Sequence, residues 1–223
     1  MLKLITWPTS PFGAKVKLAL CALNLLDRVE IEHYHPWKKG DAFRVLNPLK
    51  KIPVLIQENG STLYDSPVIC DYVNGLRDQK TPTLFPKEKY YDILTIQALC
   101  DGILDSGVSV RYETHFRPHP LQSKDWIRRQ MMAIESGGQY LNQKIQDKKG
   151  VLSFEESDLS LAHLCVIVTL SYLDVRYPEL RARKTWASLG EWKEKILKDY
   201  PHFESHLPRD YLPLPQDLEG LSQ

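Results

Sequence analysis

The sequence lacks paired cysteines, and this absence argues against one class of enzyme. Its 223 residues contain four cysteines, none of which forms a Cys-x-x-Cys motif with another. A thioredoxin-type dithiol reductase is therefore disfavoured. Each cysteine stands in an apolar stretch with helical spacing, so we expect buried thiols and a reducing, cytoplasmic compartment.

The sequence also lacks excess charge, long apolar runs and internal repeats. It carries 29 basic and 28 acidic residues, a net charge of +1, which gives no reason to expect nucleic acid or an anionic membrane as partner. No apolar run approaches the roughly 20 residues of a membrane helix. Pro8 interrupts the first apolar run too early for a signal peptide. We therefore expect a cytoplasmic protein without a membrane or nucleic-acid partner.

The first third of the chain predicts a small α/β unit. Leu2–Thr6 and Val29–His33 have the short apolar pattern of strands, and a helix begins between them at Pro11 with Ser10 as its N-cap. A strand, a helix and a second strand within about 33 residues form a βαβ unit, whose strands are parallel. Residues 37–46 are polar and irregular, with room for one helical turn.

A hairpin and a helix follow. Val54–Ile56 and 62–64 predict its two strands around a turn at Gly60, and Ser66 is the expected N-cap of a helix to about residue 76. The backbone near Ile52 can pair with a peptide-like ligand, and the amides at Ser66 can hold a carboxylate. A proline at a strand edge and an ordinary capped helix explain the same residues without a ligand.

The remaining chain is helical. Pro82 and Pro86 mark a linker over 79–86, between an α/β domain over 1–78 and an all-helical domain over 87–223. We expect helices over 90–116, 125–146, 159–175 and 186–198, with the third as the central one, and an extended proline-rich tail. The predicted fold class is α+β with two domains, βαβ–ββα followed by helices.

Several motifs, in order, resemble those of the cytosolic glutathione S-transferases. They are Thr9-Ser10-Pro11-Phe12, Asn47-Pro48-x-x-Lys51-Ile52-Pro53-Val54-Leu55, Asp65-Ser66-Pro67-Val68-Ile69, Ala98-Leu99-x-Asp101-Gly102-Ile103-x-Asp105 and Tyr172-Leu173-Asp174-Val175-Arg176. The resemblance covers nearly the whole chain and is nearest to a bacterial group that begins with Ser-Pro-Phe. It implies a thioredoxin-like first domain, a homodimer, glutathione as co-substrate and no metal.

The resemblance also implies roles for individual residues. Ser10 would hydrogen-bond the sulfur of glutathione, with Thr9 as the alternative hydroxyl, and Ile52 would bind the cysteinyl part through its backbone beside a cis Pro53. The other expected glutathione contacts are Asp65 and Ser66 at the γ-glutamyl end, Lys51 and Lys38 at the glycyl carboxylate, Phe12, and Asp101 reaching across the dimer interface. The alternatives are a plain N-cap for Ser10, solvated surface lysines, and a buried hydrogen-bonding carboxylate at Asp101.

A second-substrate pocket and the absence of a metal site are weaker expectations. Trp7, Phe12, Tyr112 and Phe116 are candidates to line an apolar pocket, although aromatic residues at helical spacing also form ordinary core. Some pairs have metal-like spacing without a third ligand, so we expect no metal. These pairs are Asp101 with Asp105, His33 with His35, and His202 with His206.

The predicted function is transfer of the glutathione thiolate to an electrophilic small molecule, which the sequence does not name. A glutathione-dependent isomerase or peroxidase, or a non-catalytic glutathione- or ligand-binding protein, is the alternative. One position departs from the family pattern. The central helix begins Ser160-x-x-His163, where the family has an acidic capping residue. Histidine is expected to cap poorly, leaving Asp158 to serve instead and making His163→Asp a stabilising change.

Overall fold

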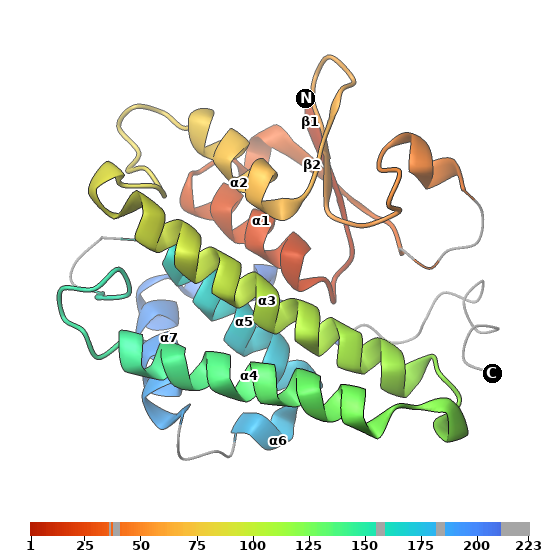
Figure 1. Cartoon of the computed structure of the whole chain (residues 1–223). Coiled ribbons are helices and arrows are strands. Elements are labelled where there is room, and N and C mark those ends of the chain that lie inside the picture. Colours follow the sequence, from red (N-terminus) through yellow and green to blue (C-terminus); the bar gives the residue numbers. More distant parts are fainter. Residues whose placement is uncertain (36, 38–40, 155–158, 182–185, 211–223) are drawn as a thin grey trace.

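The computed structural model describes residues 1–35, 37, 41–154, 159–181 and 186–210. An α/β part and a helical part lie against each other, with α1 and α2 between the sheet and the helical part (Figure 1). The two parts share one continuous hydrophobic core. The boundaries predicted for the two domains and the linker stay a prediction.

The α/β part is built on four strands. They are β1 (Leu2–Thr6), β2 (Val29–His33), β3 (Val54–Ile56) and β4 (Thr62–Leu63). Their order is β2-β1-β3-β4, with β1 parallel to β2 and antiparallel to β3. In the register, Leu4 pairs with Ile31 on one side and Leu55 on the other. The βαβ–ββα topology predicted from the sequence is confirmed.

Alternation along the strands gives the sheet two covered faces. Leu4 and Leu55 belong to the main core with α1 (Pro11–Ala22) and α2 (Ser66–Gly75). Ile5 and Val54 point the other way and pack on Phe43. Phe43 lies in a 3-10 turn over Ala42–Val45, which is the single helical turn expected in this segment.

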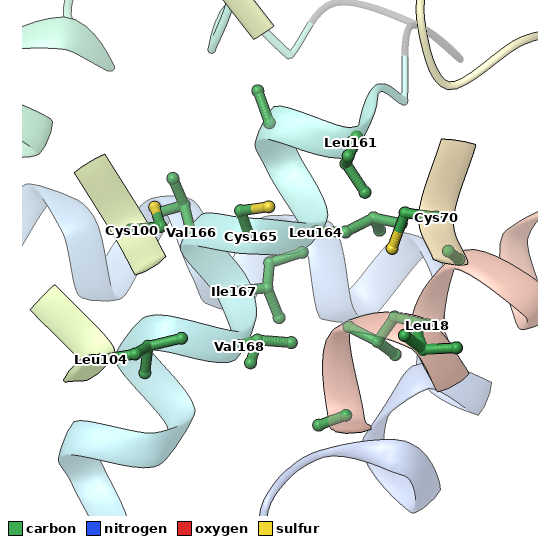
Figure 2. Packing of buried hydrophobic residues seen from close by; sticks show 14 of the residues in the cluster. Leu18, Cys70, Cys100, Leu104, Leu161, Leu164, Cys165, Val166, Ile167 and Val168 are labelled. Carbon is green, nitrogen blue, oxygen red and sulfur yellow. The ribbon is translucent and has the colours of Figure 1, made fainter. Parts of the chain in front are cut away.

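The helical part is organised around α5 (Leu161–Arg176), whose residues from 161 to 173 are all buried. The other helices are α3 (Tyr90–His115), α4 (Lys124–Lys144), α6 (Pro178–Arg181) and α7 (Ala187–Asp199). α5 packs on α3 and also on α1 of the α/β part. Figure 2 shows Cys165 of α5 among Leu18, Cys70 and Cys100, which come from α1, α2 and α3. All four cysteines are free and buried, as predicted.

The segment 87–115, which includes α3, is long and apolar enough to cross a membrane by length and composition alone. The core helix of a soluble protein has the same properties. Within the described residues, α3 packs along both α4 and α5, and its buried side chains belong to the shared core. This packing explains the apolar character of α3 without a membrane.

Several local expectations were wrong. The N-cap of α2 is Asp65, and Ser66 is the first helical residue. The second hairpin strand ends at Leu63. Part of the tail, Pro201–His206, is a 3-10 helix, and the rest of it from 211 onwards lies outside the described residues. The short α6 was not foreseen.

His163 completes a capping box rather than weakening the start of α5. Its Nδ1 accepts a hydrogen bond from the backbone N–H of Ser160 at 3.1 Å, so Nδ1 carries no proton. Its Nε2 lies 3.3 Å from the carbonyl oxygen of Ser153, and its ring stacks on Trp192 at 5.7 Å. A neutral imidazole therefore takes the place of the acidic capping residue. Asp158, the alternative cap expected from the sequence, lies outside the described residues.

Candidate active site

A cavity of about 320 Å³ lies where loops of the α/β part meet α3 and α5. The loop after β1 and the first turn of α1, together with Lys51 and Ile52, form one wall, and the C-terminal part of α3 with Phe116 after it forms the other. The lining residues are Trp7, Thr9, Ser10, Pro11, Phe12, His35, Trp37, Lys51, Ile52, Asp105, Val108, Ser109, Arg111, Tyr112, His115, Phe116, Tyr172 and Arg176. The cavity thus brings the predicted thiol site and the predicted apolar pocket together.

Ser10 is the N-cap of α1, as predicted. Its Oγ accepts the backbone N–H of Gly13 at 3.1 Å, and its hydroxyl has no other hydrogen-bond partner among the described residues. The hydroxyl proton can therefore be donated into the cavity that Ser10 lines. The free amides at the start of α1 add a partial positive charge at the same place, which favours an anion such as a thiolate.

The position of Ser10 depends on close packing between α1 and the end of β1. A Cβ added at Gly13 would lie 1.7 Å from Oγ1 of Thr6, the last residue of β1. Only glycine allows this approach, because such a contact is far inside the van der Waals distance. The glycine thereby keeps the first turn of α1 against the C-terminal end of β1.

The loop before β3 is held by a buried asparagine. The Nδ2 of Asn47 donates to the carbonyl oxygen of Lys51 at 2.9 Å, and its Oδ1 accepts from the N–H of Leu49 at 3.0 Å. The Ile52–Pro53 peptide is cis, as expected. Both Lys51 and Ile52 line the cavity, and no described residue hydrogen-bonds to the backbone N–H or C=O of Ile52. Those two groups are available to a peptide-like ligand.

Asp65 and Ser66 stand outside the cavity proper, at the start of α2. Asp65 is exposed, Ser66 is buried, and the Tyr64–Asp65 peptide is also cis, which the sequence did not predict. Burial is the main cause that raises the pKa of the carboxyls of Asp101 and Asp105, and the negative charge of Asp65 raises both further.

Asp101 already has a partner within its own chain. Its two carboxylate oxygens lie 2.6 and 2.8 Å from Nζ of Lys15, whose side chain is 1% exposed. Burial is the largest influence on Lys15 and acts to lower its pKa, but its neighbours, among them the contacting carboxylate of Asp101, raise it overall. The structure thus favours the buried-carboxylate alternative for Asp101, and its contact across a dimer stays a prediction.

The four aromatic residues predicted for the pocket all line the cavity. Sequence reasoning missed a fifth, Trp37, which stacks on Phe116 at 4.5 Å and meets Tyr112 edge-on at 5.1 Å. Trp7 likewise contacts His35 edge-on at 4.9 Å. The aromatic surface therefore spans both parts of the molecule.

Two arginines in the cavity wall were also missed. Arg111 comes from α3 and Arg176 from the end of α5, beside Tyr172. Burial and then the charge of Arg176 lower the pKa of the Arg111 guanidinium, and burial with both arginines lowers the pKa of His115. No local motif marks them, because residues 65 positions apart meet only after α3 and α5 have packed.

One expected glutathione contact cannot be placed in the structure. Lys38 lies outside the described residues. Within those residues no group of three histidine, cysteine or acidic side chains is arranged to hold a metal ion. Of the expected glutathione contacts, Ser10, Phe12, Lys51 and Ile52 line one cavity, and Pro53 follows directly.

Comparison with known proteins shows which protein family the chain resembles. Residues 9–76 match the model of the glutathione S-transferase N-terminal domain. The uncharacterized GST-like protein YibF of Escherichia coli K12 is 31% identical over 178 residues, which cover 78% of this chain and 83% of the relative.

Solved structures agree over nearly the full length. A glutathione transferase family member from Pseudomonas fluorescens Pf-5, solved with bound glutathione, has a TM-score of 0.85 at 31% identity and covers 94% of this chain and 100% of its own. A glutathione S-transferase from Methylobacterium radiotolerans, in complex with glutathione sulfonate, has a TM-score of 0.84 at 26% identity, with 96% and 98% covered. The chain therefore belongs to the glutathione S-transferase family.

Proposed function

We propose that this protein is a glutathione transferase that joins the sulfur of glutathione to an electrophilic carbon. The observation that carries the proposal is the placement of Ser10. Its hydroxyl caps α1, faces a cavity, and stands beside the unpaired backbone groups of Ile52. A thiol bound through Ile52 then lies next to one hydroxyl donor and one helix N-terminus.

The Ser10 hydroxyl and the N-terminus of α1 can together supply the free energy needed to stabilise a thiolate. A free thiol has a pKa of about 8.5, and lowering it by about two units requires roughly 2.7 kcal/mol of preferential thiolate stabilisation. A hydrogen bond to a charged group contributes about 1.5–3 kcal/mol, and a helix N-terminus about 0.3–1 kcal/mol. The thiol proton passes to solvent. The thiolate sulfur then forms a bond to the electrophilic carbon, while the leaving group on that carbon departs with the electron pair of its own bond.

The rest of glutathione fits the groups around Ser10. In our proposal the Ile52 backbone holds the cysteinyl part and Phe12 packs on it. Lys51, with Lys38, neutralises the glycyl carboxylate. Ser66 and the amides of α2 hold the γ-glutamyl carboxylate, while Asp65 pairs with its ammonium. Support comes from the cis Pro53 loop and from the exposed Asp65 at the start of α2.

Ser10 rather than Thr9 is the proposed partner of the thiolate, which would place the chain in the bacterial Ser-type group. Both residues line the cavity. Only Ser10 is the N-cap, so its oxygen shares its position with the free amides of α1. The aromatic residues Trp7, Tyr112 and Phe116 then line the space for the second substrate.

Product analysis tests this function against its alternatives. Glutathione should bind, and mass spectrometry should detect its S-conjugate with members of an electrophile panel. A reaction that leaves glutathione unconsumed would instead identify an isomerase, and production of glutathione disulfide from a peroxide would identify a peroxidase. Binding of glutathione without turnover of any compound would contradict the proposal and favour a non-catalytic protein.

We also propose that the protein is a cytoplasmic homodimer. Four free thiols fit a reducing compartment. Apolar side chains are exposed on α2 and at the start of α3, with Val68 48% and Tyr91 80% exposed, which a symmetric partner would cover. Light scattering at micromolar concentration should give twice 25.8 kDa, and a mass of 25.8 kDa alone would reject the dimer.

A further inference from the structure

We propose that the electrophile carries an anionic group, a carboxylate or sulfonate on an aromatic body, and that Arg111 and Arg176 bind this anion. The inference rests on the proposed function and names the substrate class of the same cavity. It starts from two arginines that line a space otherwise walled mainly by aromatic rings.

Arg111 is a half-buried cation without a carboxylate partner. Among the described residues, no acidic oxygen lies within 4 Å of its guanidinium. Arg176 is 16% exposed and pairs with Asp210 at 2.7 Å, but Asp210 is 59% exposed. Two guanidinium groups therefore share one carboxylate, which stands toward solvent. The charge of each guanidinium acts on the same neighbouring imidazole, His115.

The acid in the cavity wall does not offset this charge. Asp105 is the acidic residue among those lining the cavity. Burial raises the pKa of the Asp105 carboxyl, and the ammonium of Lys51 is the strongest influence in the opposite direction. Lys51, Arg111 and Arg176 line the same cavity as Asp105, so the charged side chains of its lining keep a net positive charge.

Physical chemistry favours an anionic ligand at such a place. Partial burial removes water from the Arg111 guanidinium, and a cation that loses water without gaining a partner costs free energy. An organic anion offsets that cost. Arginine also has a planar fork of donors that matches a carboxylate or a sulfonate. The rings of Trp7, Trp37, Tyr112 and Phe116 provide flat apolar contact for the body of the ligand.

A purely structural explanation makes different predictions. Arg176 is the last residue of α5, and Arg111 precedes the end of α3 by four residues. Cations near helix C-termini stabilise the helix dipole. If this were their whole role, replacing either arginine would lower thermal stability and leave the preference between charged and neutral ligands unchanged.

Two electrophiles that differ in one charge separate these explanations. The pair is 4-(chloromethyl)benzoate and 4-(chloromethyl)benzamide. In both, the thiolate forms an S–C bond as chloride leaves with the C–Cl electron pair. We expect kcat/KM, divided by the uncatalysed rate constant, to favour the benzoate at least tenfold. Arg111→Gln and Arg176→Gln should each lower this ratio at least fivefold.

The matched control is Arg128→Gln, which removes an arginine 71% exposed on α4 and should leave the ratio unchanged. Arg111→Lys keeps the positive charge but loses the planar set of guanidinium donors, so it should retain part of the preference for the benzoate. A ratio near one in the wild type, or one that neither cavity variant alters, overturns the proposal.

A binding measurement without glutathione keeps this result separate from the proposed catalysis. 1-Anilinonaphthalene-8-sulfonate and N-phenyl-1-naphthylamine differ by a single sulfonate, and both fluoresce on apolar binding. The Kd of the sulfonate dye should rise at least fivefold relative to that of the neutral dye in the two cavity variants. If neither chloromethyl compound reacts, turnover across the electrophile panel decides the catalytic proposal, and the dye ratio still decides the anion site. Equal shifts for both dyes reject it.

Discussion

The two walls of the cavity differ in the groups that they present to a ligand: mainly main-chain groups on one wall and side chains on the other. On the α/β wall, the proposed contacts to glutathione come mostly from the main chain, through the amides of α1 and the unpaired backbone of Ile52, with Ser10 adding one hydroxyl. On the helical wall, the proposed contacts to the second substrate come from side chains, through aromatic rings and the two arginines. The first wall therefore suits a constant ligand, and the second can change specificity by single substitutions.

The two walls are joined by the buried pair of Lys15 in α1 and Asp101 in α3, and breaking this pair should have the largest effect. Lys15→Met leaves the Asp101 carboxylate without its ammonium 2.6 Å away. Loss of one partner of a buried ion pair costs about 3–5 kcal/mol, so we expect a fall of that size in the free energy of unfolding. Urea denaturation measures it.

The double variant Lys15→Met with Asp101→Leu is the matched control. It removes both charges and fills the space with apolar groups, so most of the lost stability should return. A single variant that loses less than about 1 kcal/mol, or a double variant no more stable than the single one, would show that the pair is not what joins the two walls.

Substitution of His163 at the start of α5 should destabilise the helical part of the molecule. His163→Asp, expected from the sequence to stabilise, should instead lower the free energy of unfolding by about 2–3 kcal/mol. The carboxylate loses the contact to Ser153 and the stacking on Trp192, and it buries a charge. His163→Asn keeps a neutral acceptor for Ser160 and should lose less. A higher melting temperature for the Asp variant would restore the original expectation.

Lys17 is a second buried lysine of α1 and differs from Lys15, which is paired with Asp101. It lies two residues from Lys15, about 200° around the helix, and no carboxylate among the described residues offsets the burial of its ammonium. Burial, aided by the charge of Arg209, lowers its pKa from 10.5 to about 8. Below pH 8 the lysine is charged in both states, so folding bears the cost of burying the charge.

Between about pH 8 and 10.5 the unfolded chain holds this proton more tightly than the folded one, so stability should rise with pH across that window. Lys17→Met should therefore add about 1–2 kcal/mol to the free energy of unfolding at pH 7 and flatten the rise. Urea titrations at pH 7 and 9.5 test both. A variant that is less stable at pH 7 would mean that the charged lysine is well solvated or paired.

The same contrast between the walls explains what sequence could predict. The cap at Ser10 and the βαβ–ββα succession are encoded in stretches of a few residues, and the cis Pro53 was implied by the family resemblance of such a stretch; all three were found in the structure. Arg111 and Arg176 were missed because their meeting depends on how α3 and α5 pack. His163 was misjudged because its partners Ser153 and Trp192 lie ten and 29 residues away.

Titration of bound glutathione by the absorbance of its thiolate measures whether Ser10 stabilises that thiolate. Ser10→Ala removes the hydroxyl but keeps the amides of α1. The pKa of the bound thiol should rise by about one to two units, while the Kd of glutathione changes little.

Turnover at neutral pH should then fall at least tenfold and partly recover as the pH rises. Thr9→Ala and the double variant show whether the neighbouring hydroxyl substitutes for Ser10. We expect the wild type and Thr9→Ala to share a low thiol pKa and both Ser10 variants to lose it. The same titration curve for the wild type and the double variant would show that Ser10 is only a helix cap, and would contradict the mechanism.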